Sequence, residues 1–397
     1  MNGEDKKVTV KVIQGGESAK PASECRRMLV GPGVNQPDPF PGYDGFVGWE
    51  APVRLKDGTW LVGFSAGYWH ASPPTPHRLD EVTRKEWSRL GMQMDIDAPT
   101  GGRAMLIRST NEGMTWSKPE TIIDTPADDR HPNFVELPDG TLLCTFFIAN
   151  GYGDFVKDPT IVGRTVIIRS KDGGKTWDKN QILPPSPFAA DATDGPIIVL
   201  KDGSALLATY GGTAVGVPEQ VALFRSTDSG KTWKLLSVVK SDHEMSEPTV
   251  AQLPSGRLVL VTRPEADICW SDDGGKTWTK PVSLGMRIFD PGLIMLKDGA
   301  LLLIHGSYGA GGGLHAIFSI DGGETWISPN EKYGFVIDKN VYGYGKGIEL
   351  PDGSVFIAYI HTGGHSTKDA QTEAIWGVRV KVRSDHSGID ILPAPGR

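Results

Sequence analysis

Two short patterns recur along the chain, and they constrain the fold more than any other feature. The first, Ser-x-Asp-x-Gly-x-Thr-Trp, occurs five times, with Asn111 replacing Asp in the first copy, at residues 109–116, 170–177, 226–233, 271–278 and 319–326. The second is a Gly-containing turn between two apolar segments, with six copies around residues 57–58, 139–140, 202–203, 255–256, 298–299 and 352–353. A repeat of roughly 45 to 60 residues is typical of propeller blades.

Both patterns predict tight turns between β-strands. Asp-Gly between β-rich runs is a strong hairpin signal. In the longer pattern, Asp accepts backbone N–H groups, Gly takes a positive φ and Trp packs between units, so we assign it a structural role rather than calcium binding. Six hairpins with such turns between them predict an all-β chain, folded as a six-bladed β-propeller of four-stranded antiparallel blades.

The last of the six units has no copy of the longer pattern. We therefore expect the N-terminal strand at residues 8–14 to complete that blade and close the ring, which removes exposed sheet edges. Residues 1–397 are predicted to form a single propeller domain, with a lid-like insertion at about 65–103 in the first blade. Connections of this length are usually functional.

Composition and charge exclude several classes of protein. Fifty Gly and 29 Pro suit a chain of many turns, while 39% hydrophobic residues and 11 Trp exclude a disordered chain. The net charge of −7, without a Lys/Arg run, predicts no nucleic-acid partner and no membrane partner. The start MNGEDKK lacks the apolar core of a signal peptide. We expect a mature periplasmic or secreted form, with a cytoplasmic protein as the alternative.

Cysteine and histidine spacing predicts no catalytic metal. Cys25, Cys144 and Cys269 have neither CxxC spacing nor nearby His partners, and HExxH is absent. Thiols in strand-like apolar runs are usually buried and inert. The sequence therefore predicts no metal and no cofactor.

A set of mostly ionisable residues recurs eight positions before each hairpin turn, where the innermost strand of a blade begins. The six positions hold Trp49 with Glu50, His131, Asp194, Glu247, Asp290 and Tyr344. Pro or Gly follows closely in each case. Innermost strands face the central channel, where propellers bind ligands. These residues are therefore the predicted site.

The longer pattern is the Asp box, and with this blade arrangement the chain resembles the sialidase superfamily from about Val8 to Val382. The resemblance implies the propeller fold and a carbohydrate ligand. That superfamily contains sialidases, other exo-glycosidases, uronate-directed lyases and binding modules. Its sialidases use a Tyr nucleophile activated by a Glu, an Asp general acid, and three Arg that clamp the substrate carboxylate.

Two segments are similar to the family segments that carry these residues. SEPTVAQLPSGRLVLVTR is similar to the stretch in which the Glu precedes one clamp Arg, which implies Glu247 and Arg263. YGYGKGIELPDG is similar to the nucleophile segment, which implies Tyr344. A phenol with a pKa near 10 needs a base to attack an anomeric carbon.

Two of the three clamp arginines have no counterpart. Where the family has Arg-Ile-Pro, this chain has Glu50-Ala51-Pro52, and the segment YGAGGGLHAIFS before the fifth Asp box offers only Gly and His for the third. A sialic acid carboxylate would meet Glu50 rather than a cation. We therefore expect a substrate other than a sialoside.

The insertion supplies further candidates. In sialidases the general acid comes from the corresponding part of the chain, which implies Asp95 or Asp97. Trp69 and His70 are candidates for sugar contacts, because aromatic rings stack on sugar faces. The insertion is thus expected to contribute both chemistry and binding.

The ring supplies the remaining candidates. His131 is a candidate for substrate binding or proton transfer, because His titrates near working pH. Asp194 and Asp290 are candidates to bind hydroxyls, and Arg130 and Lys346 to hold an anionic substituent. Three further histidines, His305, His361 and His365, are expected to be ordinary rim residues.

The leading hypothesis is an exo-acting glycoside hydrolase that cleaves a terminal sugar other than sialic acid. Its nucleophile and base are Tyr344 and Glu247, or Asp290 and Glu50 act as an acid/base pair. The alternatives are a true exo-sialidase, a uronate-directed lyase in which His131 or Tyr344 abstracts the C5 proton, and a non-catalytic carbohydrate-binding propeller. The dense ionisable ring favours an enzyme. An oligosaccharide or polysaccharide is the expected partner.

Overall fold

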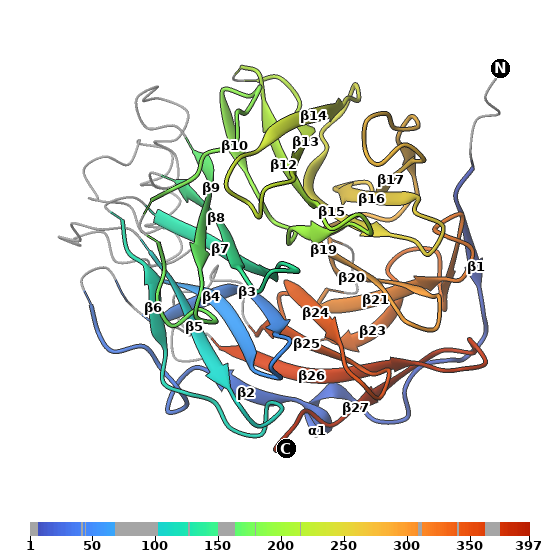
Figure 1. Ribbon diagram of the computed structural model, residues 1–397. Helices are drawn as coiled ribbons and strands as arrows, with labels where there is room; N and C mark the ends of the chain where they lie inside the picture. Colours follow the sequence, from blue (N-terminus) through green and yellow to red (C-terminus); the bar gives the residue numbers. More distant parts are fainter. Residues whose placement is uncertain are drawn as a thin grey trace, which may run out of the picture.

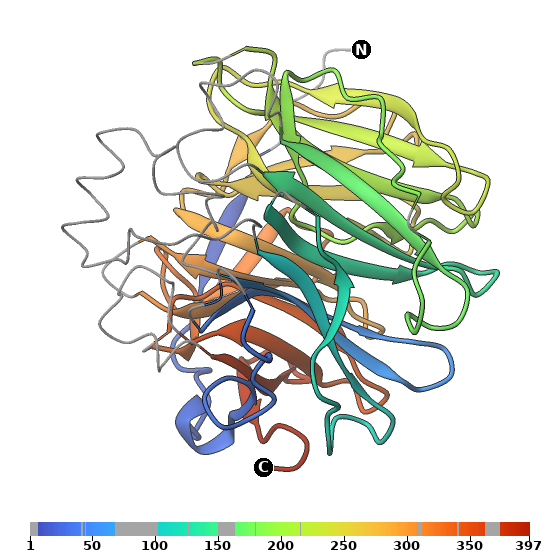
Figure 2. The ribbon, with the colours of Figure 1, turned by 90° about the vertical axis from the view of Figure 1, so that its left-hand side faces the viewer.

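The computed structural model describes residues 7–40, 43, 45–67, 102–125, 128–149, 163–178, 180–214, 216–308, 312–339, 341–361 and 374–397. These residues form six sheets, antiparallel apart from one added N-terminal strand, which are arranged as the blades of a β-propeller around a common axis (Figure 1). Figure 2 shows the blades from the side. One short helix, α1 (Ala22–Cys25), is found in the described part of the chain. The predicted all-β six-bladed propeller is therefore confirmed.

The first three blades follow chain order from the axis outward. Their strands are β3 (Phe46–Arg54), β4 (Trp60–Gly67), β5 (Arg103–Ser109) and β6 (Glu120–Ile123); β7 (Asp128–Glu136), β8 (Leu142–Ala149) and β9 (Arg164–Ser170); and β10 (Ala190–Ala192), β11 (Ile198–Val199), β12 (Ala205–Gly212), β13 (Gln220–Ser226) and β14 (Lys234–Val239). In the second blade, an isolated β-bridge between Ile182 and Ile167 takes the place of a fourth, outermost strand. The inner strand of the third blade is split into β10 and β11.

The last three blades repeat this order. Their strands are β15 (Ser246–Gln252), β16 (Leu258–Arg263), β17 (Asp267–Ser271) and β18 (Val282–Ser283); β19 (Ile288–Met295), β20 (Leu301–Ser307), β21 (Leu314–Ser319), β22 (Thr325–Ser328) and β23 (Phe335–Asp338); and β24 (Gly345–Glu349), β25 (Val355–Ile360), β26 (Ile375–Val382) and β27 (Ile389–Leu392). The inner strands β24 and β3 are in contact, so the sixth blade adjoins the first.

The hydrophobic core is divided among the seams between blades. Successive side chains of a strand point to opposite faces of its sheet, so Leu301 and Leu303 of β20 pack toward the fourth blade, and Leu302 and Ile304 toward the sixth. Six clusters of buried apolar side chains fill the six seams in this way. Each blade therefore depends on its neighbours for its core.

The repeated turns have the hydrogen bonds that the sequence predicts. In the copy at 226–233, Thr232 donates its N–H to Asp228 Oδ1 at 2.9 Å, and Gly230 donates to Ser226 Oγ at 3.0 Å. Gly230 has a φ of 73°, and Trp233 is buried in the seam between the second and third blades. These side chains are committed to the fold.

The predicted strand at residues 8–14 belongs to a different blade from the one expected. β1 (Thr9–Val12) pairs in parallel with β22 of the fifth blade, and Val8 and Val10 pack beside the seam that contains Trp326. The sixth blade receives β2 (Arg27–Val30), which pairs with β26. The alternating apolar pattern correctly predicted a strand. It did not show whether that strand pairs with the outer edge of the fifth blade or with that of the sixth. Packing of the valines selects the edge in the fifth blade.

Three smaller expectations concern the rest of the chain. The insertion lies between β4 and β5, and its residues 68–101 are outside the described part. The three cysteines are free and buried, as predicted. Among the described residues, no helix has the length and apolar character needed to cross a bilayer.

Candidate active site at the propeller axis

Four inner strands bulge at the same position and carry a non-glycine residue with positive φ there. The residues are Trp49 (55°), His131 (55°), Glu247 (48°) and Asp290 (47°). The pairing register of each strand shifts at this point. Such a backbone costs on the order of 1–3 kcal/mol per residue, and bulges re-aim side chains. Backbone strain thus marks four of the six positions that the sequence assigns to the site.

Lys346 of β24 joins three blades at the axis. Its Nζ donates to Asp194 Oδ2 at 2.8 Å, to Asp290 Oδ1 at 2.6 Å and to the carbonyl oxygen of Pro291 at 3.2 Å. Burial favours a neutral amine, but the two carboxylates outweigh it and raise the pKa of Lys346 above its usual value. The sixth blade thereby supplies a fixed positive charge to the third and fifth blades.

His131 extends this network to the second blade. Its Nδ1 lies 2.9 Å from Asp194 Oδ1. Asn133 Nδ2 donates to the backbone oxygens of His131, at 3.0 Å, and Asp194, at 2.9 Å, which fixes the two segments relative to each other. Burial acts to raise the pKa of Asp194, but Lys346 and His131 hold it below its usual value. Asp194 is therefore an ionised carboxylate that lies between the ammonium of Lys346 and the ring of His131.

Glu247 of the fourth blade is held by a backbone group and a cation. Its Oε2 accepts the N–H of Asp290 at 2.7 Å and lies 3.1 Å from Arg263 Nε. Arg263 also donates to Ser246 Oγ at 3.1 Å and Tyr308 Oη at 2.8 Å. Burial raises the pKa of Glu247 to about 7, although Arg263 opposes the rise. A carboxylate that titrates near neutral pH suits a general base.

Tyr344 is coupled to Glu247 through Asp290. Gly345, the next residue, donates its N–H to Asp290 Oδ2 at 2.7 Å, while the N–H of Asp290 binds Glu247. The Tyr344 ring is buried, with its centroid 5.2 Å from the parallel ring of Tyr342. Burial, and after it the charge of Glu247, raises the pKa of Tyr344 well above its usual value. The phenol therefore needs a base before it can react.

Glu50 of the first blade is a buried acid. Its exposed fraction is 2%, and neither carboxylate oxygen has a hydrogen-bond partner among the described residues. Burial raises the pKa of Glu50 well above its usual value. Burial therefore favours the neutral carboxylic acid, a form that offers an O–H donor.

Every cation that the structure places at the site is already paired with a carboxylate. Arg130 Nε binds Asp128, and its guanidinium lies over the Trp49 ring, 5.1 Å from the centroid. The other two pairs are Arg263 with Glu247, and Lys346 with both Asp194 and Asp290. Within the described residues, no cation of the site is left over for an anionic group of a substrate.

His131, Asp194 and Asp290 together resemble a cation site, since their ligand atoms lie within 4.8 Å of one another. Lys346 Nζ, however, already contacts both carboxylates. The chain itself thus supplies the positive charge that the two acids require. We assign these residues to the hydrogen-bond network rather than to a metal.

The remaining predicted residues fall into two groups. Four candidates of the insertion lie outside the described residues, as does His365; they are Asp95, Asp97, Trp69 and His70. His305, expected at the rim, is instead fully buried, and its ring stacks on His315 at 6.0 Å. The alternating strand pattern places His305 on the same face as the core residue Leu303, which is why it is internal.

Two residues of the site were not predicted. Asp128 pairs with Arg130, and the position of this acid two residues before the Arg in an inner strand was the available signal, since both then share one face. Tyr308 follows β20 directly and reaches Arg263 of the adjacent blade. No sequence pattern indicates a contact between these two blades.

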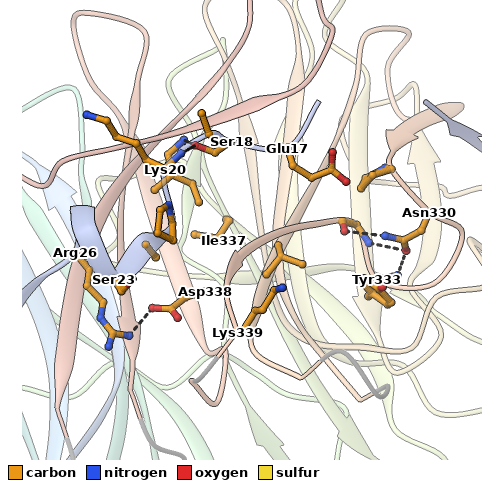
Figure 3. Close-up of a pocket in the computed structure, with 17 residues that line it drawn as sticks. Glu17, Ser18, Lys20, Ser23, Arg26, Asn330, Tyr333, Ile337, Asp338 and Lys339 are labelled. Atoms are coloured by element: carbon orange, nitrogen blue, oxygen red, sulfur yellow. Dashed lines mark hydrogen bonds and ion pairs between the residues drawn. The ribbon is translucent and has the colours of Figure 1, made fainter. Parts of the chain in front are cut away.

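A separate cavity of about 570 Å³ lies away from the axis, between the N-terminal segment and the region of β23 (Figure 3). Arg26 points toward Asp338 across its wall, with Nη1 and Oδ2 2.6 Å apart, and Tyr359 Oη also donates to Asp338 at 2.9 Å. These charges are satisfied within the protein. The cavity wall therefore anchors the N-terminal segment to the fifth and sixth blades.

Comparison with known proteins agrees with this architecture. A model of the BNR repeat-like domain matches residues 101–357, well over half of the chain. A sialidase of Bacteroides fragilis (strain YCH46) is 28% identical over 219 residues, which cover 44% of this chain and only 40% of that sialidase. The resemblance to the sialidase superfamily is confirmed.

Two solved structures share the fold. A protein of unknown function from Dyadobacter fermentans has a TM-score of 0.68 and 20% identity, covering 90% of this chain and 99% of that one. An α-L-arabinanase from Penicillium chrysogenum, complexed with arabinobiose, has a TM-score of 0.56 and 13% identity, covering 89% and 97%. At these identities the likeness concerns the fold alone.

Proposed function

Because this chain belongs to the BNR repeat-like domain family, we propose that it is an exo-acting glycoside hydrolase that removes a terminal sugar other than sialic acid. Its similarity to a sialidase and to an arabinanase supports a carbohydrate substrate. In the first half-reaction, Glu247 accepts the phenol proton of Tyr344, Tyr344 Oη attacks the anomeric carbon as the bond to the leaving group breaks, and the leaving oxygen takes a proton from solvent.

The observation that carries this proposal is the environment of Glu247. Its carboxylate is held by Arg263 and the backbone of Asp290, and burial places its pKa at about 7. A base with this pKa is partly ionised at neutral pH and still able to take a proton. The backbone link from Glu247 through Asp290 to Gly345 fixes the base relative to the Tyr344 nucleophile.

The charge pattern supports a neutral sugar rather than a sialoside. Glu50 stands where the superfamily has a clamp arginine, and Arg263 is already engaged by Glu247 and by Tyr308. A carboxylate brought into the site would have to compete for a cation that is paired. Breaking a buried charge pair costs about 2 to 5 kcal/mol.

A uronate-directed lyase is the second candidate, and one observation favours it. The His131 and Tyr344 rings lie 6.4 Å apart in an edge-to-face arrangement, so a base and a phenol face the same space. The pairing of Arg130 with Asp128 weighs against it, because a lyase must neutralise the uronate carboxylate.

The test is a panel of fluorogenic 4-methylumbelliferyl glycosides, which includes neutral pentosides and hexosides, a glucuronide and an α-sialoside, together with uronate oligosaccharides. We expect turnover of a neutral glycoside and none of the sialoside. An unsaturated product absorbing in the ultraviolet from the uronate oligosaccharides would instead support the lyase. Sialoside turnover, or no turnover of any glycoside, would contradict the proposal.

A further inference from the structure

We propose that His131 and Asp194 form a catalytic dyad in which Nε2 of His131 is the general base that activates the hydrolytic water. This inference rests on the proposed glycoside hydrolase function and assigns the proton acceptor of its second half-reaction. Nothing in the resemblance to sialidases assigns this role to a histidine of the second blade.

The dyad is held from the side of Nδ1. That nitrogen lies 2.9 Å from Asp194 Oδ1, and Lys346 Nζ donates to the other oxygen at 2.8 Å. A buried carboxylate beside Nδ1 fixes the tautomer that has its proton on Nδ1 and its lone pair on Nε2. Nε2 has no partner among the described residues. It is the nitrogen left for chemistry.

Aromatic rings fix the plane of the imidazole. Trp49 stacks on it with centroids 5.0 Å apart, and the Phe147 centroid is 5.4 Å away. The φ of 55° at His131 adds a backbone constraint, and its N–H donates to Ser65 Oγ at 3.1 Å. A base oriented by packing and by a carboxylate needs little reorganisation during the reaction.

The charged groups that face His131 keep it ready to accept a proton. They are Asp194 and Asp290 with their partner Lys346, and Arg130 on the same strand. Burial lowers the pKa of His131; Asp194 opposes this, while Lys346 and Arg130 add to it. The free imidazole is therefore neutral near pH 7, and the ionised Asp194 stabilises the imidazolium that forms.

The step balances within the residues of the site. After the first half-reaction, the sugar is bonded to Tyr344 Oη and Glu247 carries the phenol proton. Nε2 of His131 takes one proton from water as the water oxygen bonds to the anomeric carbon and the bond to Tyr344 Oη breaks. The departing phenolate recovers its proton from Glu247, and His131 returns its proton to solvent.

The tautomer can be tested without a substrate. In protein labelled with ¹⁵N-histidine, two-dimensional NMR of the imidazole nitrogens distinguishes Nδ1–H from Nε2–H, and loss of a signal in H131N assigns His131. We expect Nδ1–H in the wild-type protein and a changed tautomer in D194N. An Nε2–H tautomer in the wild-type protein would overturn the dyad.

The kinetic test uses the 2,4-dinitrophenyl glycoside of the sugar that the panel identifies. We expect H131N to release one equivalent of dinitrophenol rapidly and then to turn over about 10²- to 10⁴-fold more slowly than wild type. Azide, a nucleophile that needs no base, should restore turnover and yield a glycosyl azide. H305N serves as the control for replacing a buried His elsewhere.

The two proposals fail in different ways. If wild-type protein hydrolyses the glycoside while H131N shows no burst or no response to azide, the dyad is wrong and the hydrolase stands. If wild-type protein hydrolyses no glycoside, the hydrolase is wrong, and the NMR tautomer alone decides whether the dyad exists.

Discussion

Lys346 and Asp194 come from opposite blades of the ring, the sixth and the third, yet Nζ and Oδ2 are 2.8 Å apart. The ammonium thus spans the axis and donates to the carboxylates of both Asp194 and Asp290. Because all three side chains are buried, the stability of the axis depends on this single charge.

Replacement of Lys346 by Met is expected to destabilise the protein by about 3 to 5 kcal/mol, since it leaves two buried carboxylates without the ammonium that both contact. Denaturant unfolding at pH 7 measures the loss. K381M is the matched control, because Lys381 lies on the exposed side of the same blade and its replacement should cost less than about 0.5 kcal/mol. Equal stability of the two variants would show that the axis tolerates the unpaired acids.

Tyr344→Phe and Glu247→Gln are expected to slow turnover of the glycoside that the panel identifies. The first removes the nucleophilic oxygen, and the second replaces the base by an isosteric amide. Losses of at least about 10³-fold in kcat are expected for Y344F, and about 10²- to 10⁴-fold for E247Q. The control is Tyr342→Phe, which keeps the stacked ring. Unchanged activity in Y344F would show that a different residue of the site is the nucleophile.

Arg263→Met is expected to shift the acid limb of the pH profile. Arg263 lowers the pKa of Glu247, which lies at about 7 with the arginine in place. Without it, Glu247 must hold its proton to higher pH, so activity that needs the ionised carboxylate should begin at higher pH. The profile of kcat/KM from pH 5 to 9 measures the shift, and a limb that stays in place would exclude Glu247 as the base.

Glu50→Gln is expected to change the pH dependence of stability. The folded pKa of Glu50 lies well above 4.5, so the folded state binds more protons than the unfolded state above pH 4.5. The contribution of Glu50 to stability therefore falls as pH rises from 4.5, by about 1.4 kcal/mol per pH unit up to the folded pKa. In E50Q this loss should be absent. Parallel stability curves from pH 5 to 8 would contradict the neutral acid.

His305 is expected to lower the stability of the folded state as pH falls, whereas Glu50 lowers it as pH rises. Burial, with His315 beside it, lowers the pKa of His305 to about 3, against a usual 6.5. The unfolded state then binds more protons between pH 6.5 and 3, so stability falls as pH falls through that range. Between pH 7 and 5, H305N should lose about 2 kcal/mol less than wild type. Equal losses in urea unfolding would show that His305 is not the responsible group.

The sequence predicted the ring residues because the propeller repeats its geometry. Each hairpin turn follows the position that begins the inner strand by eight residues, so the places of His131, Asp194, Glu247, Asp290 and Tyr344 in their blades follow from counting. Counting does not show which residues meet across the axis. The ion pair that links Lys346 to the opposite blade forms only if the lysine side chain can span the ring. The diameter of the ring, and so the distance to be spanned, is a property of the assembled fold.

The same limit explains the misplaced N-terminal strand. A strand pattern identifies β1 but not its neighbour, because β22 and β26 both present unpaired backbone groups at an outer edge. Tyr308 was missed for a similar reason: its contact with Arg263 joins two blades that local sequence does not relate.

The placement of β1 on the fifth blade and β2 on the sixth has a consequence for the order of events during synthesis. Thr9 pairs with Thr325, and Arg27 with Gly377, so the partners of this early segment are translated after several hundred other residues. Contacts of such sequence separation form late. As the ribosome releases the chain, blades one to four can assemble in sequence while the early segment remains unpaired. Docking of that segment on the fifth and sixth blades then completes their outer edges, so the ring is closed last by residues that were made first.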